Sequence, residues 1–131
     1  MKYVKIILRI SIAVILIQTL AYKFTAHPDS VYIFTQVGLE PYGRIGIGVL
    51  ELIAGVLILI TRTSWCGALM TIGIISGAIF MHLTMLGAEV RGDGGMLFGM
   101  AVLVFILASI SLWFSRFDVP FVKNLFQTEL P

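Results

Sequence analysis

The chain has 131 residues, of which 59% are hydrophobic and 12% are charged, and its formal net charge is +2. Soluble domains usually contain about 45–50% apolar and about 25% charged residues, so this composition excludes an ordinary soluble fold. The small net charge also excludes a nucleic-acid-binding surface. We therefore expect a single transmembrane domain over residues 1–131, because no long polar segment remains to form a second domain.

The first long apolar segment covers residues 3–24, and Lys5 and Arg9 near its start can extend to the membrane interface. A basic start followed by an apolar stretch is also the pattern of a signal peptide, although residues 19–21 form a poor cleavage site. We favour a retained transmembrane helix, because Tyr22 and Lys23 are typical of a helix end that faces polar partners.

The connection that follows begins a new helix at Pro28 and Asp29. The next residues are rich in aromatic side chains, which prefer the depth of the membrane interface. We predict a short interfacial segment over residues 29–38.

Three further apolar segments cover residues 42–60, 65–86 and 96–114. Like the first, each is about long enough to cross a hydrocarbon core of ~30 Å as a helix. Their continuous apolar character favours helices over the alternating strands of a membrane barrel. The predicted fold class is therefore all-α, an integral membrane four-helix bundle, in which the tight turn at residues 61–64 forms an antiparallel hairpin.

Small residues recur at a spacing that suits close helix packing, within the chain or between copies. The pairs are Gly73 with Gly77 and Gly95 with Gly99. The single cysteine, Cys66, cannot form an internal disulfide, and we interpret it as a small buried side chain.

The distribution of basic residues predicts the orientation of the chain. With four spans, both termini lie on the same side of the membrane. That side contains Lys2, Lys5, Arg9, Arg62, Arg116 and Lys123. The other side contains three basic residues and four acids: Lys23, Arg44, Arg91, Asp29, Glu40, Glu89 and Asp93. By the positive-inside rule, both termini are expected to be cytoplasmic in the cell membrane.

Glu51 is the most informative ionisable residue, because a carboxylate within a membrane helix is costly and usually faces a partner inside the bundle. It lies seven positions after Arg44, about 10 Å deeper along the helix axis. Arg44, Gly48, Glu51 and Gly55 share one helix face. We expect that face to point into the bundle.

His82 lies near the outer end of the third long helix and so at about the depth of Arg44. Lys23 ends the first helix on the same side, and Glu89 follows His82 in the next loop. The sequence thus predicts a ligand-binding cluster in the outer half of the bundle: Lys23, Arg44, Glu51, His82 and Glu89. A structural alternative stays open, in which Arg44 and Glu51 form an ion pair that fixes the helix register. These groups are too few for a metal site, and no zinc or haem spacing is present, so we expect no metal.

The stretch from Arg44 to Leu59, RIGIGVLELIAGVLIL, together with AIFMH ending at His82, resembles the DoxX and DoxX-like family. Residues 22–24 and 38–41 also resemble that family, and the resemblance extends over about residues 10–115. It implies a four-helix membrane fold with Arg44, Glu51 and His82 as its polar core, and with Lys23 as a weaker match.

The resemblance also implies a function. The family takes its name from a small subunit of thiosulfate:quinone oxidoreductase, and related members are linked to membrane oxidoreductase complexes. We therefore expect a membrane subunit of a quinone-linked oxidoreductase system, with a quinone as cofactor and a redox protein as partner. Arg44 and His82 would bind the quinone, while Glu51 would orient Arg44 or relay a proton. The chain has no cofactor motif or cysteine pair of its own, so it would be at most a subunit of an enzyme.

Two other functions are consistent with the same residues. The broader group also resembles eukaryotic cargo receptors, and the chain could be a non-enzymatic scaffold or a carrier of a small molecule or lipid. A proton-coupled transporter would require a homo-oligomer, because four helices are few for alternating access. The glycine pairs would allow such association.

Overall fold

The computed structural model describes residues 2–87, 92 and 94–116. These residues form five α-helices, connected in part by a short 3₁₀ turn and a π-helical turn. The helices are α1 (Lys2–Phe24), α2 (Pro28–Gln36), α3 (Tyr42–Leu59), α4 (Ser64–Met81) and α5 (Met96–Phe114). The 3₁₀ turn covers Thr61–Thr63, and the π-helical turn His82–Leu86 extends α4. The described part of the chain contains no strand, and four of its helices are long and apolar enough to cross a membrane. The predicted all-α four-helix fold is therefore confirmed.

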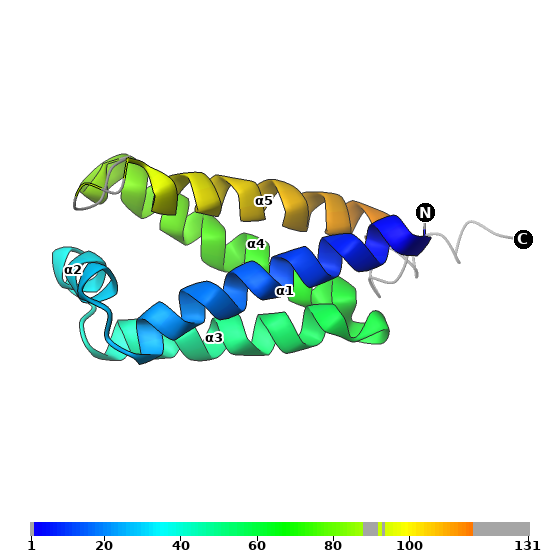
Figure 1. Cartoon of the computed structure of the whole chain (residues 1–131), viewed down its shortest axis with the longest axis horizontal. Helices are drawn as coiled ribbons and strands as arrows, with labels where there is room; N and C mark the ends of the chain where they lie inside the picture. Colours follow the sequence, from blue (N-terminus) through cyan, green and yellow to red (C-terminus); the bar gives the residue numbers. More distant parts are fainter. Residues whose placement is uncertain (1, 88–91, 93, 117–131) are drawn as a thin grey trace, which may run out of the picture.

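The four long helices form an antiparallel bundle in which α1 packs against α3 and α5, and α4 packs against the same two helices. Figure 1 shows α2 lying across one end of this bundle, which we call the α2 end. At the opposite end α1 begins, α5 ends and the turn Thr61–Thr63 joins α3 to α4. We call it the hairpin end. The short α2 begins at Pro28, a residue that suits the first turn of a helix.

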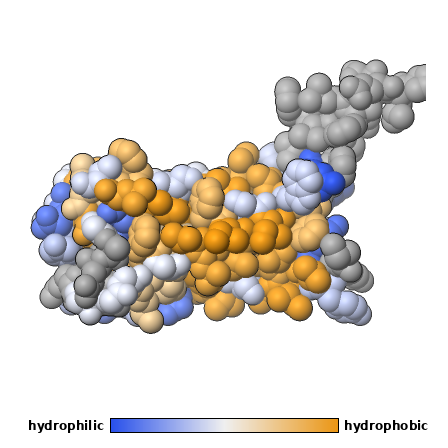
Figure 2. Space-filling view, turned by 90° about the horizontal axis from the view of Figure 1, so that it is seen from above, coloured by the Kyte–Doolittle hydropathy of each residue, from blue (hydrophilic) through white to orange (hydrophobic). Residues whose placement is uncertain are grey.

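The outer surface of the bundle is apolar along its middle. Large side chains such as Ile17, Val56, Leu69 and Leu103 are about half exposed. Figure 2 shows hydrophobic residues covering the middle of the visible face, with hydrophilic residues gathered toward the two ends. A continuous apolar belt between polar ends is the surface that a lipid bilayer requires.

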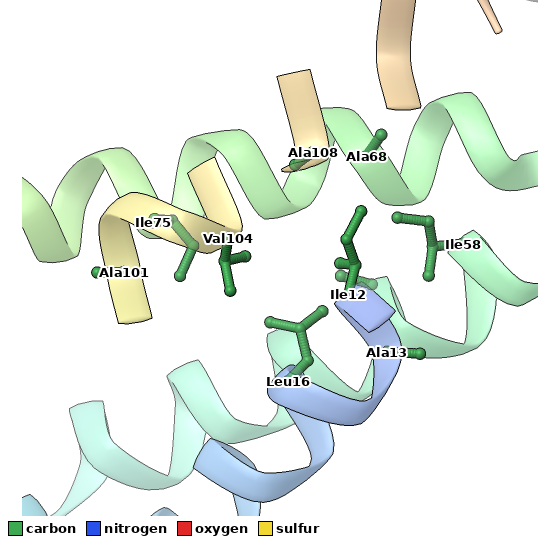
Figure 3. Packing of buried hydrophobic residues seen from close by; sticks show 10 residues of the cluster. Ile12, Ala13, Leu16, Ile58, Ala68, Ile75, Ala101, Val104 and Ala108 are labelled. Atoms are coloured by element: carbon green, nitrogen blue, oxygen red, sulfur yellow. The ribbon is translucent and has the colours of Figure 1, made fainter. Parts of the chain in front are cut away.

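The apolar core lies between the four long helices. Ile12 from α1, Ile58 from α3 and Ala108 from α5 are completely buried. Figure 3 shows Ile12 beside Ile58, while Val104 of α5 lies near Ile75 of α4. The remaining members of the core are Ala13, Leu16, Ala54, Ala68 and Ala101. Many of these residues are alanines, so the helices can approach closely, as is common in membrane bundles.

At Gly67, α4 lies close to the backbone of α3. A Cβ atom added at Gly67 would lie 2.5 Å from the Ile58 backbone nitrogen and 2.8 Å from the Ala54 carbonyl oxygen. By contrast, nothing lies within 4 Å of the Cβ position at Gly73, Gly77 or Gly99 in the described structure. The sequence pattern therefore pointed to the wrong glycines for close packing within the chain, because that packing depends on where α3 crosses α4.

Candidate functional site

A cavity of about 420 Å³ lies inside the α2 end of the bundle and is lined by residues of all five helices. Figure 1 shows the α1/α3 and α4/α5 pairs diverging toward this end, where α2 lies. Most of the wall is apolar, with Ile15, Ile33, Ile74 and Met100 among its residues. The volume falls within the range of about 300–1,000 Å³ that is typical of small-molecule sites.

Lys23 and Glu51 form a buried ion pair on this cavity. The distance from Lys23 Nζ to Glu51 Oε1 is 3.1 Å, and the two side chains are 15% and 4% exposed. The hydroxyl of Thr19 donates a hydrogen bond of 3.3 Å to Glu51 Oε2. Lys23 lies in the last turn of α1 and Glu51 in the middle of α3, so the pair links two antiparallel helices. Pairing with Lys23 is what makes a carboxylate tolerable at this position.

Arg44 is buried beside the cavity but does not line it. Its Nε donates to the two carboxylate oxygens of Glu40, at 2.8 and 3.0 Å. One terminal nitrogen of Arg44 also donates to the backbone carbonyl oxygen of Lys23, near the end of α1. The structural alternative of an Arg44–Glu51 pair is therefore wrong, and so is the expectation that Glu51 orients Arg44. Arg44 lies in the first turn of α3 and reaches Glu40 four positions earlier, whereas Glu51 is two turns deeper.

His82 contributes a third ionisable group to the cavity wall. It is 6% exposed and begins the π-helical turn that extends α4. Its Nδ1 lies 3.0 Å from the carbonyl oxygen of Gly87, and the backbone N–H of Gly87 donates to the His82 carbonyl at 2.8 Å. Because a carbonyl oxygen can only accept, Nδ1 is the nitrogen that carries hydrogen. The Nε2 atom of the neutral ring is then an acceptor.

The structure adds polar groups that the sequence-based cluster did not contain. His27 lines the cavity from the start of α2, where its Nδ1 accepts a hydrogen bond of 3.2 Å from the backbone N–H of Asp29. Its ring meets that of Tyr22 edge to face, with centroids 4.5 Å apart. Asp29 and Thr19 line the same cavity. In the sequence, His27 stands directly before Pro28, a signal that identifies a helix start but not a place beside a cavity.

The cavity thus unites three of the five residues predicted for the site, namely Lys23, Glu51 and His82. Arg44 lies beside it, and Glu89 falls outside the described residues. Among the residues that the structure describes, no group of three or more His, Cys, Asp and Glu side chains is placed to hold a metal ion.

The DoxX family model matches residues 4–84, a stretch that runs from the start of α1 to the π-helical turn. The chain belongs to the DoxX family. No curated protein and no solved structure matches the chain significantly. The matched region contains the three predicted site residues that line the cavity, Lys23, Glu51 and His82. Together with its four apolar helices, the family places this DoxX protein in a membrane as a multi-pass protein.

Proposed function

We propose that this DoxX protein is a membrane subunit of a quinone-linked oxidoreductase system and that its cavity binds the quinone head group. One observation carries the proposal: the buried Lys23–Glu51 pair and His82 line a single cavity whose other walls are mostly apolar. A quinone needs both kinds of surface, because its ring carries two polar oxygens and its isoprenoid tail is apolar. The oxidoreductase context comes from the family resemblance described above.

Lys23 and His82 are the groups suited to the two quinone oxygens. An ammonium group has three N–H donors, so Lys23 can keep its bond to Glu51 while donating to a quinone oxygen. The neutral ring of His82 accepts at Nε2 and would therefore bind the hydroxyl of a quinol. When protonated, the same ring donates and would bind a quinone carbonyl. The site can accordingly hold both redox forms of the ligand.

Glu51 and His82 are also the groups suited to carry protons. Reduction of a quinone to a quinol consumes two electrons and two protons. We assign the electrons to a redox partner protein. His82 and Glu51 would each take up one proton from water at the α2 end and pass it to the reduced quinone, as buried acids and histidines serve such relays in membrane proteins. In this account Arg44 is a positioning residue, because it fixes the end of α1 next to Lys23.

The proposal can be tested with wild-type protein and single variants in lipid nanodiscs, titrated with a short-chain quinone and examined by native mass spectrometry. His82→Ala should weaken quinone binding by about tenfold, the loss expected for one hydrogen bond involving a charged or tightly placed group. Glu51→Gln should have a similar effect through Lys23, because the Glu51 carboxylate holds the ammonium group that donates to the quinone. Glu40→Gln is the matched control, because Glu40 is also a paired carboxylate at the α2 end but does not line the cavity. It should change binding by less than about twofold.

Two results would contradict the proposal. One is a wild-type protein that binds no quinone. The other is a control variant that weakens binding as much as Glu51→Gln does. Retention of a lipid instead of a quinone in the cavity would favour the carrier function.

We also propose that the hairpin end faces the cytoplasm. The described basic residues at that end are Lys5, Arg9, Arg62 and Arg116, and the described carboxylates, Asp29, Glu40 and Glu51, belong to the opposite half of the bundle. A cysteine introduced at Arg62 should then be protected from a membrane-impermeant thiol reagent in intact cells, while one introduced at Thr35 in α2 should react.

A further inference from the structure

A second, smaller cavity lies at the hairpin end, far from the proposed quinone site. Its volume is about 90 Å³, which is room for more than a single water molecule. Six of its seven lining residues are polar, and they come from α1, from the turn after α3, and from α4 and α5. The residues are Lys5, Arg9, Thr61, Ser64, Ser111, Phe114 and Ser115. This lining is the reverse of the mainly apolar wall at the α2 end.

Arg9 has an unmet hydrogen-bond donor at this cavity. Its Nε is buried and has no hydrogen-bond partner among the described residues. A buried guanidinium N–H without an acceptor is costly. The Nε of Arg9 therefore requires a hydrogen-bond acceptor that the described residues do not supply. Ser64 and Ser111, which line the same cavity, are only 3% and 5% exposed.

The electrostatics of the cavity favour an anion. Lys5 and Arg9 are four positions apart on α1 and so share one helix face. No described carboxylate lines the cavity, because the described acids, Asp29, Glu40 and Glu51, all belong to the other half of the bundle. The two positive charges therefore lack a counter-charge within the described residues.

We propose that this cavity binds a phosphate group. Arg9 would supply directional donors, Lys5 a mobile positive charge, and the serine and threonine hydroxyls further donors. A phosphate offers several oxygens to such a convergent set and is a preferred partner of Arg. The phosphate belongs either to an anionic phospholipid or to a soluble molecule. Lys5 and Arg9 lie within the first turns of a membrane-spanning helix, where lipid head groups are found.

The test uses full-length protein in nanodiscs that contain phosphatidylglycerol and phosphatidylcholine, and native mass spectrometry measures which lipid each variant retains. Wild type should retain phosphatidylglycerol about tenfold better than Arg9→Gln, the effect of losing a charge-assisted hydrogen bond. The matched control is Arg62→Gln, which removes the same charge at the same end from an exposed residue that does not line the cavity. It should change retention by less than about twofold.

A competition experiment distinguishes the two sources of phosphate. Millimolar inorganic phosphate that displaces the lipid, or that raises the melting temperature of wild type but not of Arg9→Gln in a neutral detergent, would identify a soluble ligand. Lipid that resists such competition would identify a head group. Lys5→Gln should also weaken phosphate binding. Because Lys5 is exposed, this change leaves the core intact, and it therefore separates a loss of binding from a folding defect in Arg9→Gln. Equal losses in Arg9→Gln and Arg62→Gln, or no loss in either cavity variant, would overturn the proposal.

Discussion

The two ends of the bundle differ in how the same four helices pack. Toward the hairpin end α3 and α4 are in backbone contact at Gly67, and Ile12 and Ile58 are completely buried. Toward the α2 end the helix pairs diverge around a cavity of about 420 Å³. The half toward the hairpin end thus supplies most of the apolar packing, and the other half contains the larger of the two cavities described above.

The difference extends to the charges. At the α2 end, Lys23 is paired with Glu51 and Arg44 with Glu40. At the hairpin end, Lys5 and Arg9 line a cavity that contains no described carboxylate. Both described cations of the α2 end are paired with carboxylates of the chain, so this end suits a neutral amphiphile, whereas the hairpin end suits an anion.

The largest effect on the α2 end is expected from Lys23→Met. This change leaves the Glu51 carboxylate buried without its cation, and breaking a buried pair in this way costs about 3–5 kcal/mol. The free energy of unfolding in detergent micelles measures the loss. The double variant Lys23→Met/Glu51→Leu removes both charges and should recover most of the stability, whereas a double variant as unstable as the single one would show that the pair is not the cause.

The hairpin end is tested by Gly67→Ala. The added methyl group would meet the backbone of Ile58 and Ala54, which cannot move aside as a side chain can, and such overpacking costs about 1–3 kcal/mol. Gly73→Ala is the control in the same helix, because its Cβ position is open. This control should leave stability unchanged or raise it by up to about 1 kcal/mol through helix propensity. Equal unfolding curves for the two variants would mean that α3 and α4 are not in close contact.

A smaller effect is expected from Arg44→Gln, which separates the positioning role from the binding role. Loss of the charged hydrogen bonds to Glu40 and to the Lys23 carbonyl should lower stability by about 1.5 kcal/mol. Because Arg44 lies outside the cavity, quinone affinity should fall by less than about threefold. A tenfold loss of quinone affinity without loss of stability would instead show that Arg44 takes part in binding the quinone.

The sequence was sufficient for the fold class because the length of an apolar segment is a local property that the bilayer thickness selects. It also predicted that Lys23, Glu51 and His82 lie near one another, since antiparallel helices place residues of similar depth side by side. The sequence did not predict the partner of Glu51 correctly, which is Lys23 and not Arg44. The spacing of Arg44 and Glu51 put both on one face of α3, but the choice between Arg44 and Lys23 depended on how α1 packs against that face.

Other features had no local signal at all. His27 belongs to the cavity only because α2 lies across the end of the bundle, a tertiary arrangement that the turn residues around Pro28 do not encode. Gly67 matters only because α3 crosses α4 at that point. From the sequence we expected Arg9 to extend to the interface, yet its Nε is buried beside a cavity that is lined by α1, α4, α5 and the turn between α3 and α4.

The smallest effect should come from Thr19→Val, which preserves the shape of the side chain and removes its hydroxyl. The Thr19 hydroxyl lies 3.3 Å from Glu51 Oε2 and also 2.9 Å from the Leu16 carbonyl oxygen, so a single hydrogen is shared between two acceptors. Each bond is therefore weak, and the expected loss of stability is about 0.5–1 kcal/mol. Thr25→Val removes a similar bond, to the Ala21 carbonyl, at an exposed position and should cost less. In the Lys23→Met background the Thr19 bond is the polar contact of Glu51 that remains among the described residues, so Thr19→Val should cost more stability there than in wild type. Strictly additive losses would mean that Thr19 does not help to hold the carboxylate in place.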